Sequence, residues 1–353
     1  MRRFALSLTL AATAMLGTVA VQSQAKAPTA PSGPPRLIVA ISVDQFSADL
    51  YAQYRSTYRF GLARLGQGAV FPAGYQSHAA TETCPGHSTL LTGAHPARTG
   101  IIANTWYEPD GKRGTKPIYC AEDERDPASS PKNPVVSAFH LKVPTLGEYM
   151  KQANPASRNV AVSAKDRAVM MMGGHQIDAG YWWKGAGFVT LNGRTLSPAA
   201  NRENAAITST LKKGAKGLPI PANCMASNLA VPVGKGSAGT GTFVLPADKP
   251  DAFRISPRMD AATVDLANAL VDEMQLGKGA APDILSVSLS ATDYIGHATG
   301  TEGLEMCIQM AQLDANIGRL LAHLDKAGID YVVVLSADHG GLDMPERASQ
   351  QAV

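Results

Sequence analysis

Short runs of apolar residues, each closed by a polar or acidic residue, recur along the chain and predict strands. The first run, RLIVAISVD, extends from Arg36 to Asp44 and is apolar almost throughout. Such strands are typical of parallel sheets covered on both faces, because neither face then needs polar side chains. Three later runs have the same character: Asn159–Ala164, Asp283–Ser290 and Tyr331–Asp338.

Between these strands, apolar residues recur at helical spacing. The stretches Asp260–Leu276 and Thr301–Lys326 carry apolar stripes of this kind, which predict amphipathic helices. Shorter helices are predicted at Tyr58–Leu65 and from Pro85 to Leu91. Because strands alternate with helices, we expect an α/β fold with a doubly wound sheet.

Two stretches interrupt the alternation and are interpreted as insertions. Residues 105–142 are rich in Pro, Lys, Asp and Ser, and residues 170–258 are rich in Gly, Pro and Asn. The second stretch contains Trp182 and Trp183 and several weak strand-like pieces. We expect these segments to cap a pocket on one catalytic domain that spans residues 36–353.

The N-terminus predicts export. Two arginines precede an apolar run, Phe4–Val21, and small residues follow it. This arrangement is typical of a secretory signal peptide, here residues 1–27, followed by a linker at residues 28–35. An uncleaved anchor is less favoured, because the run is at the short end for a membrane span. We expect a periplasmic or secreted protein with no membrane attachment after cleavage.

Charge does not identify a partner. Charged residues make up 17% of the chain and the net charge is +3, so no nucleic-acid partner is expected, and we expect a monomer. An even number of cysteines in an oxidising compartment indicates one or two disulfides, whose pairing stays open. The spacing of the cysteines matches no zinc motif: Cys84, Cys120, Cys224 and Cys307.

Acidic residues stand where three of the predicted strands stop. Asp44 ends the first strand, and Asp293 lies just past the third. Asp338 and His339 end the fourth. The carboxyl ends of strands are where open α/β sheets bind ligands, and three acids there would repel one another unless cations lay between them. His297 follows Asp293 by four residues, so one helical turn would pair them as metal ligands.

Each of these features is weak alone. An isolated Asp-x-x-x-His is more often a solvated surface pair, and Asp44 alone would more often cap a helix. The coincidence of three acidic strand ends favours a metal site. Gly340 and Gly341, which follow His339, are interpreted as letting the backbone turn sharply beside a ligand.

The segment TETCPGHSTLLTG, residues 81–93, supplies a candidate nucleophile. Thr83 lies two residues before Pro85, which suits the first turn of a helix, and a helix N-terminus favours an anion. A divalent cation can lower the pKa of a threonine hydroxyl enough for an alkoxide to form. Without the metal ligands, Thr83 would be interpreted as a helix N-cap, with Thr81 and Ser88 as equally plausible hydroxyls.

These residues resemble the alkaline phosphatase superfamily, most closely its secreted Sphingomonas-type and PafA-type alkaline phosphatases, which are related to the nucleotide pyrophosphatase/phosphodiesterases. The resemblance covers about residues 36–347 and rests on the motifs ISVDQF, TETCPGHSTLLTG, GIIANTWY, SAKDRA, SATDYIGH and SADHGG. It implies an alkaline-phosphatase-like core sheet with inserted cap segments.

The resemblance also implies a site with two Zn²⁺ ions, while a calcium requirement stays open. The residues that it assigns to the first zinc are Asp44, Thr83, Asp338 and His339. The residues that it assigns to the second zinc are Asp293, His297 and a further histidine. Phosphate contacts fall to Asn104, Lys165 and Arg167.

The implied reaction is hydrolysis of small-molecule phosphate monoesters through a covalent phospho-threonine intermediate at Thr83. Lys165 and Arg167 favour monoesters, because a dianionic monoester offers three equatorial oxygens to these cations. One alternative is a phosphodiesterase or nucleotide pyrophosphatase. Another is an inactive relative that only binds metal or phosphate, although a binder would not need an activatable threonine.

The resemblance implies a further part of the fold. The family carries its last zinc histidine well beyond SADHGG, whereas this sequence ends at Val353. We therefore expect the C-terminal part of the fold, and one ligand of the second zinc, to be missing here. A fragment of a complete enzyme is favoured over a natural truncation.

Overall fold

The computed structural model describes residues 33–71, 74–109, 117–130 and 133–351. The predicted signal peptide, residues 1–27, and most of the predicted linker lie outside the described residues. None of the helices in the described part of the chain has an apolar stretch that could span a bilayer.

A six-stranded sheet organises residues 34–353, with the strand order β10-β1-β9-β4-β5-β6. The first five strands in this order are parallel to their neighbours, and β6 is antiparallel to β5. The α/β fold is therefore confirmed, with a mixed central sheet. The strand bounds are β1 (Leu37–Val43), β4 (Asn159–Ser163), β5 (Ala179–Lys184), β6 (Gly187–Thr190), β9 (Asp283–Leu289) and β10 (Tyr331–Ala337).

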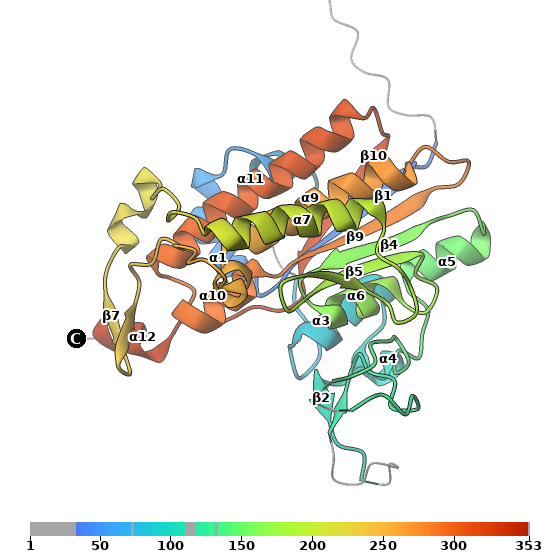
Figure 1. The fold of residues 1–353 in the computed structure, drawn as a ribbon, viewed down its shortest axis with the longest axis horizontal. Helices are drawn as coiled ribbons and strands as arrows, with labels where there is room; N and C mark the ends of the chain where they lie inside the picture. The colour runs from blue at the N-terminus through green and yellow to red at the C-terminus, as the bar shows by residue number, and fades with distance from the viewer. Residues whose placement is uncertain (1–32, 72–73, 110–116, 131–132, 352–353) are drawn as a thin grey trace, which may run out of the picture. The chain divides into compact units, whose positions relative to one another are not determined.

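Helices cover both faces of the sheet (Figure 1). One face packs against α7 (Pro198–Lys213), α9 (Pro257–Met274) and α11 (Leu304–Lys326). The other packs against α3 (Thr83–Thr92), α5 (Leu146–Ala153) and α6 (Asp166–Gly173). This double cover explains why β1, β4 and β9 are apolar almost throughout: successive side chains point to opposite faces, and both faces are buried. The edge strand β10 differs, because Val332 and Val334 on one of its faces are exposed.

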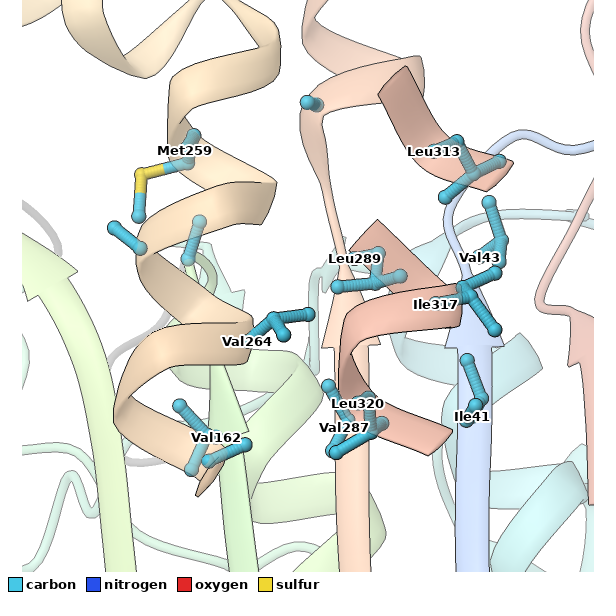
Figure 2. Packing of buried hydrophobic residues seen from close by; sticks show 14 of the residues in the cluster. Ile41, Val43, Val162, Met259, Val264, Val287, Leu289, Leu313, Ile317 and Leu320 are labelled. Atoms are coloured by element: carbon cyan, nitrogen blue, oxygen red, sulfur yellow. The ribbon is translucent and has the colours of Figure 1, made fainter. Parts of the chain in front are cut away.

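Figure 2 shows the packing on the α9 and α11 face. Ile41 and Val43 of β1 point toward the same helices as Val287 and Leu289 of β9. Leu313, Ile317 and Leu320, on successive turns of α11, meet them. The alternate β1 residue Ala40 instead joins a separate cluster on the opposite face.

The remaining elements are short and lie in the connections. The helices are α1 (Ala48–Tyr54), α2 (Gly61–Leu65), α4 (Pro96–Thr99), α8 (Pro250–Arg254), α10 (Ala291–Thr299) and α12 (Pro345–Gln351), with 3-10 turns at Arg55–Thr57 and Ala222–Ser227. Two small ribbons pair β2 (Thr105–Trp106) with β3 (Ile118–Tyr119) and β7 (Val231–Val233) with β8 (Gly236–Ala238).

The first part of the stretch predicted as an insertion, residues 170–258, belongs to the core instead. It completes α6 and contributes β5 and β6 to the main sheet. Trp182 and Trp183 are adjacent on β5, so they point to opposite faces, and each is buried in a different hydrophobic cluster. The sequence pattern hid this strand, because glycines flank the tryptophan pair.

The helix predicted at Tyr58–Leu65 is shorter in the structure. Tyr58 has an extended backbone, and the helix begins at Gly61. Asp314 of α11 explains the late start: its carboxylate accepts hydrogen bonds from the backbone amides of Arg59, Phe60 and Leu62. The contacts with α11 therefore set where this helix begins.

Candidate metal and phosphate site

Asp44, Asp338 and His339 meet at the carboxyl ends of two neighbouring strands. Val43 of β1 is paired in register with Ala337 of β10, so the residue that follows each strand reaches the same edge of the sheet. One ligand atom from each of the three residues lies within 4.8 Å of the others, and all three residues are buried. The structure thus brings together the three protein groups predicted at these strand ends.

The cluster is strongly polarised. Burial alone would raise the pKa of Asp338, but the neighbouring His87, His339 and Lys165 outweigh burial and lower it to about 2. For His339, burial acts to lower the pKa, but the carboxylates of Asp44 and Asp338 raise it to about 9. The carboxylate of Asp338 is therefore held ionised beside a cationic imidazole.

The donor set fits a divalent metal ion. Neither carboxylate oxygen of Asp44 accepts a well-oriented hydrogen bond from a described residue, and the same holds for Oδ2 of Asp338. Buried carboxylates normally have such partners. Here the side chains of Lys165 and His87 lie beside these oxygens, at 2.5 Å from Oδ2 of Asp44 and 3.1 Å from Oδ2 of Asp338, and a divalent cation could satisfy the same oxygens. Two carboxylates and an imidazole are a donor set that Zn²⁺ accepts in catalytic sites.

Thr83 is the first residue of α3, and it faces this cluster. The N-cap position belongs to Glu82, so the interpretation of Thr83 as a mere N-cap is wrong. Its Oγ1 lies 3.2 Å from the Nζ of Lys165. Of the alternative hydroxyls, Thr81 is exposed and Ser88 donates to the carbonyl oxygen of Pro85 inside the helix.

Lys165 links the two groups of predicted metal ligands. It follows β4, and its side chain is almost fully buried. Its Nζ lies 2.5 Å from Oδ2 of Asp44 and 2.6 Å from Oδ2 of Asp293. Burial acts to lower the pKa of Lys165, but Asp44, Asp293 and Asp338 outweigh burial and raise it. The ammonium is therefore fixed in its charged form between the two carboxylates.

Asp293 and His297 lie one turn apart on α10, as their spacing predicted. Nε2 of His297 is 3.2 Å from Oδ1 of Asp293. Asp293 also lies 3.8 Å from Nε2 of His339, which joins this pair to the first cluster. The His297 side chain is 71% exposed whereas that of Asp293 is buried, so the second pair lies at the rim of the site.

A disulfide and a hydrogen bond place Asn104 beside Thr83. Cys84, next to Thr83, is bonded to Cys120, and the second disulfide joins Cys224 to Cys307. Oδ1 of Asn104 accepts from the backbone amide of Cys84 at 2.8 Å. The amide nitrogen Nδ2 of Asn104 donates to no described residue, so it can serve a ligand.

Arg167 is positioned through the β2–β3 ribbon. Tyr119 of β3 donates from its hydroxyl to Oδ1 of Asp166 at 2.5 Å. Burial acts to lower the pKa of Arg167, but Tyr119, Asp44 and Asp166 raise it. Its Nε is buried and donates to no described residue. The ribbon therefore helps to place both Asn104 and Arg167.

His87, which lies inside the helix motif of residues 81–93, also belongs to the site. It is fully buried, and its Nδ1 lies 3.1 Å from Oδ2 of Asp338 and 2.9 Å from the carbonyl oxygen of Thr83. Its Nε2 lies 2.9 Å from Oγ of Ser288. His87 thus contacts one predicted metal ligand and the backbone of Thr83, the candidate nucleophile.

The glycines in these motifs allow close approach. A Cβ at Gly86 would collide with the backbone of Asp338, so this glycine lets α3 lie directly against the end of β10. Gly340 and Gly341 were expected to let the backbone turn sharply, but neither adopts a positive φ. A Cβ at Gly341 would lie 2.6 Å from Cγ of Gln45, so this glycine allows the Gln45 side chain to approach the backbone closely.

Gln45 lies between β1, β10 and α10, the three elements that carry or precede the predicted metal ligands. It adopts a positive φ of 64° directly after Asp44, a conformation uncommon outside glycine. Its backbone amide donates to Oδ1 of Asp338 at 3.1 Å. A Cβ at Gly296 of α10 would collide with its side chain. Gln45 therefore sets the distance between β1, β10 and α10.

Comparison with known proteins agrees with this geometry. The family model for type I phosphodiesterase / nucleotide pyrophosphatase matches residues 38–352. The chain is 54% identical over 323 residues to alkaline phosphatase PhoK of a Sphingomonas species, covering 91% of this chain and 58% of that protein. It is 49% identical to alkaline phosphatase PhoD of Zymomonas mobilis, covering 90% of this chain and 55% of that protein.

A crystal structure of alkaline phosphatase PafA superposes with a TM-score of 0.79 at 27% identity, covering 92% of this chain and 66% of that one. The chain thus spans a little over half the length of these two alkaline phosphatases and about two thirds of PafA. The match of the family model over nearly all of the folded region shows that the chain belongs to the type I phosphodiesterase / nucleotide pyrophosphatase family.

Proposed function

We propose that this protein hydrolyses phosphate monoesters at a two-zinc site, through a covalent phosphate ester on Thr83. The observation that carries the proposal is the position of Lys165, whose Nζ is within 3.2 Å of Oγ1 of Thr83 and also contacts Asp44 and Asp293. A phosphate placed between the nucleophile and the two carboxylate groups would meet this ammonium.

The residues that would hold the first zinc are Asp44, Thr83, Asp338 and His339, and Asp293 and His297 would contribute to the second. Zinc supplies positive charge that lowers the pKa of a bound hydroxyl or water and stabilises a leaving oxygen. Asp44 and Asp338 bring negative charge to the first position. His87 and Gln45 hold Asp338 in orientation through the contacts described above.

The remaining groups of the chain bind and orient the phosphate. Thr83 supplies the attacking oxygen, and the backbone amides in the first turn of α3 point toward an anion. Asn104, Lys165 and Arg167 offer donors to the equatorial oxygens. A solved variant of PafA replaces a threonine, an asparagine, a lysine and an arginine together. The threonine and the asparagine of that variant are as far apart in sequence as Thr83 and Asn104, and its lysine and arginine are as far apart as Lys165 and Arg167. These matching separations support our assignment.

Monoesters are favoured over diesters on charge. A monoester is a dianion at alkaline pH, whereas a diester carries one charge and one fewer free oxygen. Lys165 and Arg167 are both held in their charged forms, so together they match the dianion better. The matched family is named after phosphodiesterases. Phosphodiester hydrolysis is therefore the alternative that the test must distinguish from monoester hydrolysis.

The test compares p-nitrophenyl phosphate with bis-p-nitrophenyl phosphate, using zinc-loaded protein expressed from the complete reading frame. We expect Thr83→Ala to abolish monoester turnover with little loss of bound zinc. The exposed neighbour offers a matched control, Thr81→Ala, which should keep turnover. Arg167→Ala should lower kcat/KM for the monoester far more than for the diester. Equal losses, or a wild type that prefers the diester, would overturn the monoesterase proposal.

We also propose export to the periplasm or the medium and action as a monomer on small-molecule esters. The N-terminal pattern of residues 1–27 supports export. The two disulfides support an oxidising compartment, because disulfides persist there and are rare in the cytosol. Fractionation of cells that express the complete reading frame tests export, and recovery of all activity in the cytosol would contradict it.

A further inference from the structure

A pocket of about 310 Å³ adjoins the proposed phosphate site and contains a cation that the proposed reaction does not use. It extends from Lys165 and Arg167 to Tyr294 of α10, and its outer wall includes Trp183 and Arg254. Small-ligand pockets begin at roughly this size. The volume therefore fits the small alcohol portion of an ester and not a bulky one.

Arg254 is held in place by aromatic contacts. Its guanidinium carbon lies 4.6 Å from the centroid of the Tyr294 ring, within the range of a cation–π interaction. The preceding residue, Phe253, is buried and stacks on Trp183 with ring centroids 5.4 Å apart and an interplanar angle of 5°. This stacking anchors α8 to β5 and presents Arg254 to the pocket.

The pocket lies on the leaving-group side of the proposed phosphate position. Nζ of Lys165 is 5.3 Å from the same Tyr294 ring that Arg254 contacts, so the two cations cannot be farther apart than the sum of these two distances. Tyr294 follows Asp293, which would contribute to the second zinc, and with Thr83 held by the first zinc we assign the leaving oxygen to the second. In-line transfer to Thr83 sends the alcohol away from the nucleophile, toward this ring.

The charges in the pocket select the kind of alcohol. Lys165 and Arg167 are committed to the phosphate, and Asp166 is engaged by Tyr119. Among the described residues, the acidic side chain paired with Arg254 is that of Asp251, at 3.3 Å, but this side chain is 86% exposed, so the surface pair is weak. One cation remains for one additional negative charge, and a guanidinium pairs with a carboxylate through two parallel hydrogen bonds.

We propose that this pocket is a subsite for a carboxylate on the leaving group, so that preferred substrates are phosphate monoesters of small hydroxy acids. This inference rests on the proposed monoesterase function. Arg254 would be a specificity-determining residue that binds the substrate carboxylate, and the ring of Tyr294 would pack against the carbon chain between the two acidic groups.

Binding of phosphonates tests the subsite without requiring turnover. The probes are 3-phosphonopropionate and propylphosphonate, which has a methyl group in place of the carboxylate, titrated calorimetrically into zinc-loaded protein expressed from the complete reading frame. We expect the wild type to bind the carboxylate probe about tenfold more tightly, the effect of one partly exposed charged pair. Arg254→Gln should reduce the affinity ratio to about one.

Two further variants sharpen the result. Asp251→Asn removes the competing acid and should increase the ratio, whereas the surface variant Arg202→Gln should leave it unchanged. The kcat/KM ratio of phosphoglycolate to ethyl phosphate should follow the same order. A wild-type affinity ratio near one, or a ratio that Arg254→Gln does not change, would overturn the subsite. A wild-type protein that does not hydrolyse p-nitrophenyl phosphate would instead count against the monoesterase function. The ratio of the two phosphonate affinities would still decide whether the subsite binds a carboxylate.

Discussion

Asp260 of α9 is a buried acid whose replacement should stabilise the protein in a pH-dependent way. It is fully buried, and its Oδ1 accepts from the backbone amide of Ala291 at 2.9 Å, at the start of α10. Its Oδ2 lies 2.8 Å from Nε2 of Gln309. Burial raises its pKa from 3.8 to about 7, against the opposing effect of these hydrogen bonds.

The sign of the effect follows from proton binding. Between pH 3.8 and about 7 the unfolded chain has lost this proton, whereas the folded protein keeps it. Stability therefore falls as pH rises through this window and levels off above it. A shift of about three pKa units corresponds to about 4 kcal/mol at roughly 1.4 kcal/mol per unit. Asp260→Asn has no proton to lose, so it escapes this penalty.

Asparagine also fits the site. Its oxygen can still accept from Ala291, and its amide can donate to Oε1 of Gln309, which is buried without a partner among the described residues, once the Gln309 side chain reorients. The free energy of unfolding of Asp260→Asn, measured relative to that of the wild type, should therefore rise by about 2–4 kcal/mol as the pH is raised from 4 to 8.

Urea unfolding measures this gain, followed by tryptophan fluorescence and circular dichroism on chelator-treated protein with its disulfides intact. The exposed acid Asp248 provides the control, because Asp248→Asn should show the wild-type dependence on pH. Parallel stability curves for Asp260→Asn and the wild type would refute the reasoning. Asp260→Ala should lower the zinc content of the second site, because it removes the cap of the helix that carries Asp293 and His297.

Three shorter predictions concern the groups that position the site. His87→Ala should weaken zinc binding about 10–100-fold in a chelator competition, whereas a change at an exposed histidine, His95→Ala, should not; equal affinities would contradict the orienting role. Gly86→Ala should destabilise the fold by about 1–3 kcal/mol in thermal unfolding, because the new Cβ meets the Asp338 backbone; an unchanged Tm would show that α3 can move away. Replacing Cys84 and Cys120 together by serine should raise KM for p-nitrophenyl phosphate by loosening Asn104, whereas replacing Cys224 and Cys307 should affect stability without raising KM.

The fold was predictable where the strands carry continuous apolar runs. β1, β4 and β9 are buried on both faces, and β10 has the same apolar pattern although one of its faces is exposed. The order of these runs along the chain predicted α/β alternation. β5 and β6 were missed, because β5 combines glycine with two adjacent tryptophans, and β6 has four residues. Their assignment to the sheet depends on pairing with β4, which is a long-range contact that local sequence does not reveal.

The geometry of the first metal position was predictable for a related reason. Parallel strands end at one edge, so Asp44 and Asp338 had to approach each other if their strands were neighbours. The contribution of His87 was not predictable, because a histidine inside a helix motif is usually a packing residue. Only the contact between α3 and the end of β10 turns it toward Asp338. The position of Gln45 was likewise not predictable, because it depends on the contacts among β1, β10 and α10 in the folded protein.

Charge balance gives the arrangement its selectivity. The described site gathers three carboxylates, Asp44, Asp293 and Asp338, around the ammonium of Lys165. Such a group would be unstable without cations, because buried like charges repel one another. Two bound divalent ions would make the same group net positive and would leave the ammonium of Lys165 free to contact a ligand. A dianion would neutralise that charge better than a monoanion, so under our proposal the buried lysine that stabilises the acidic cluster would also favour a phosphate monoester over a diester.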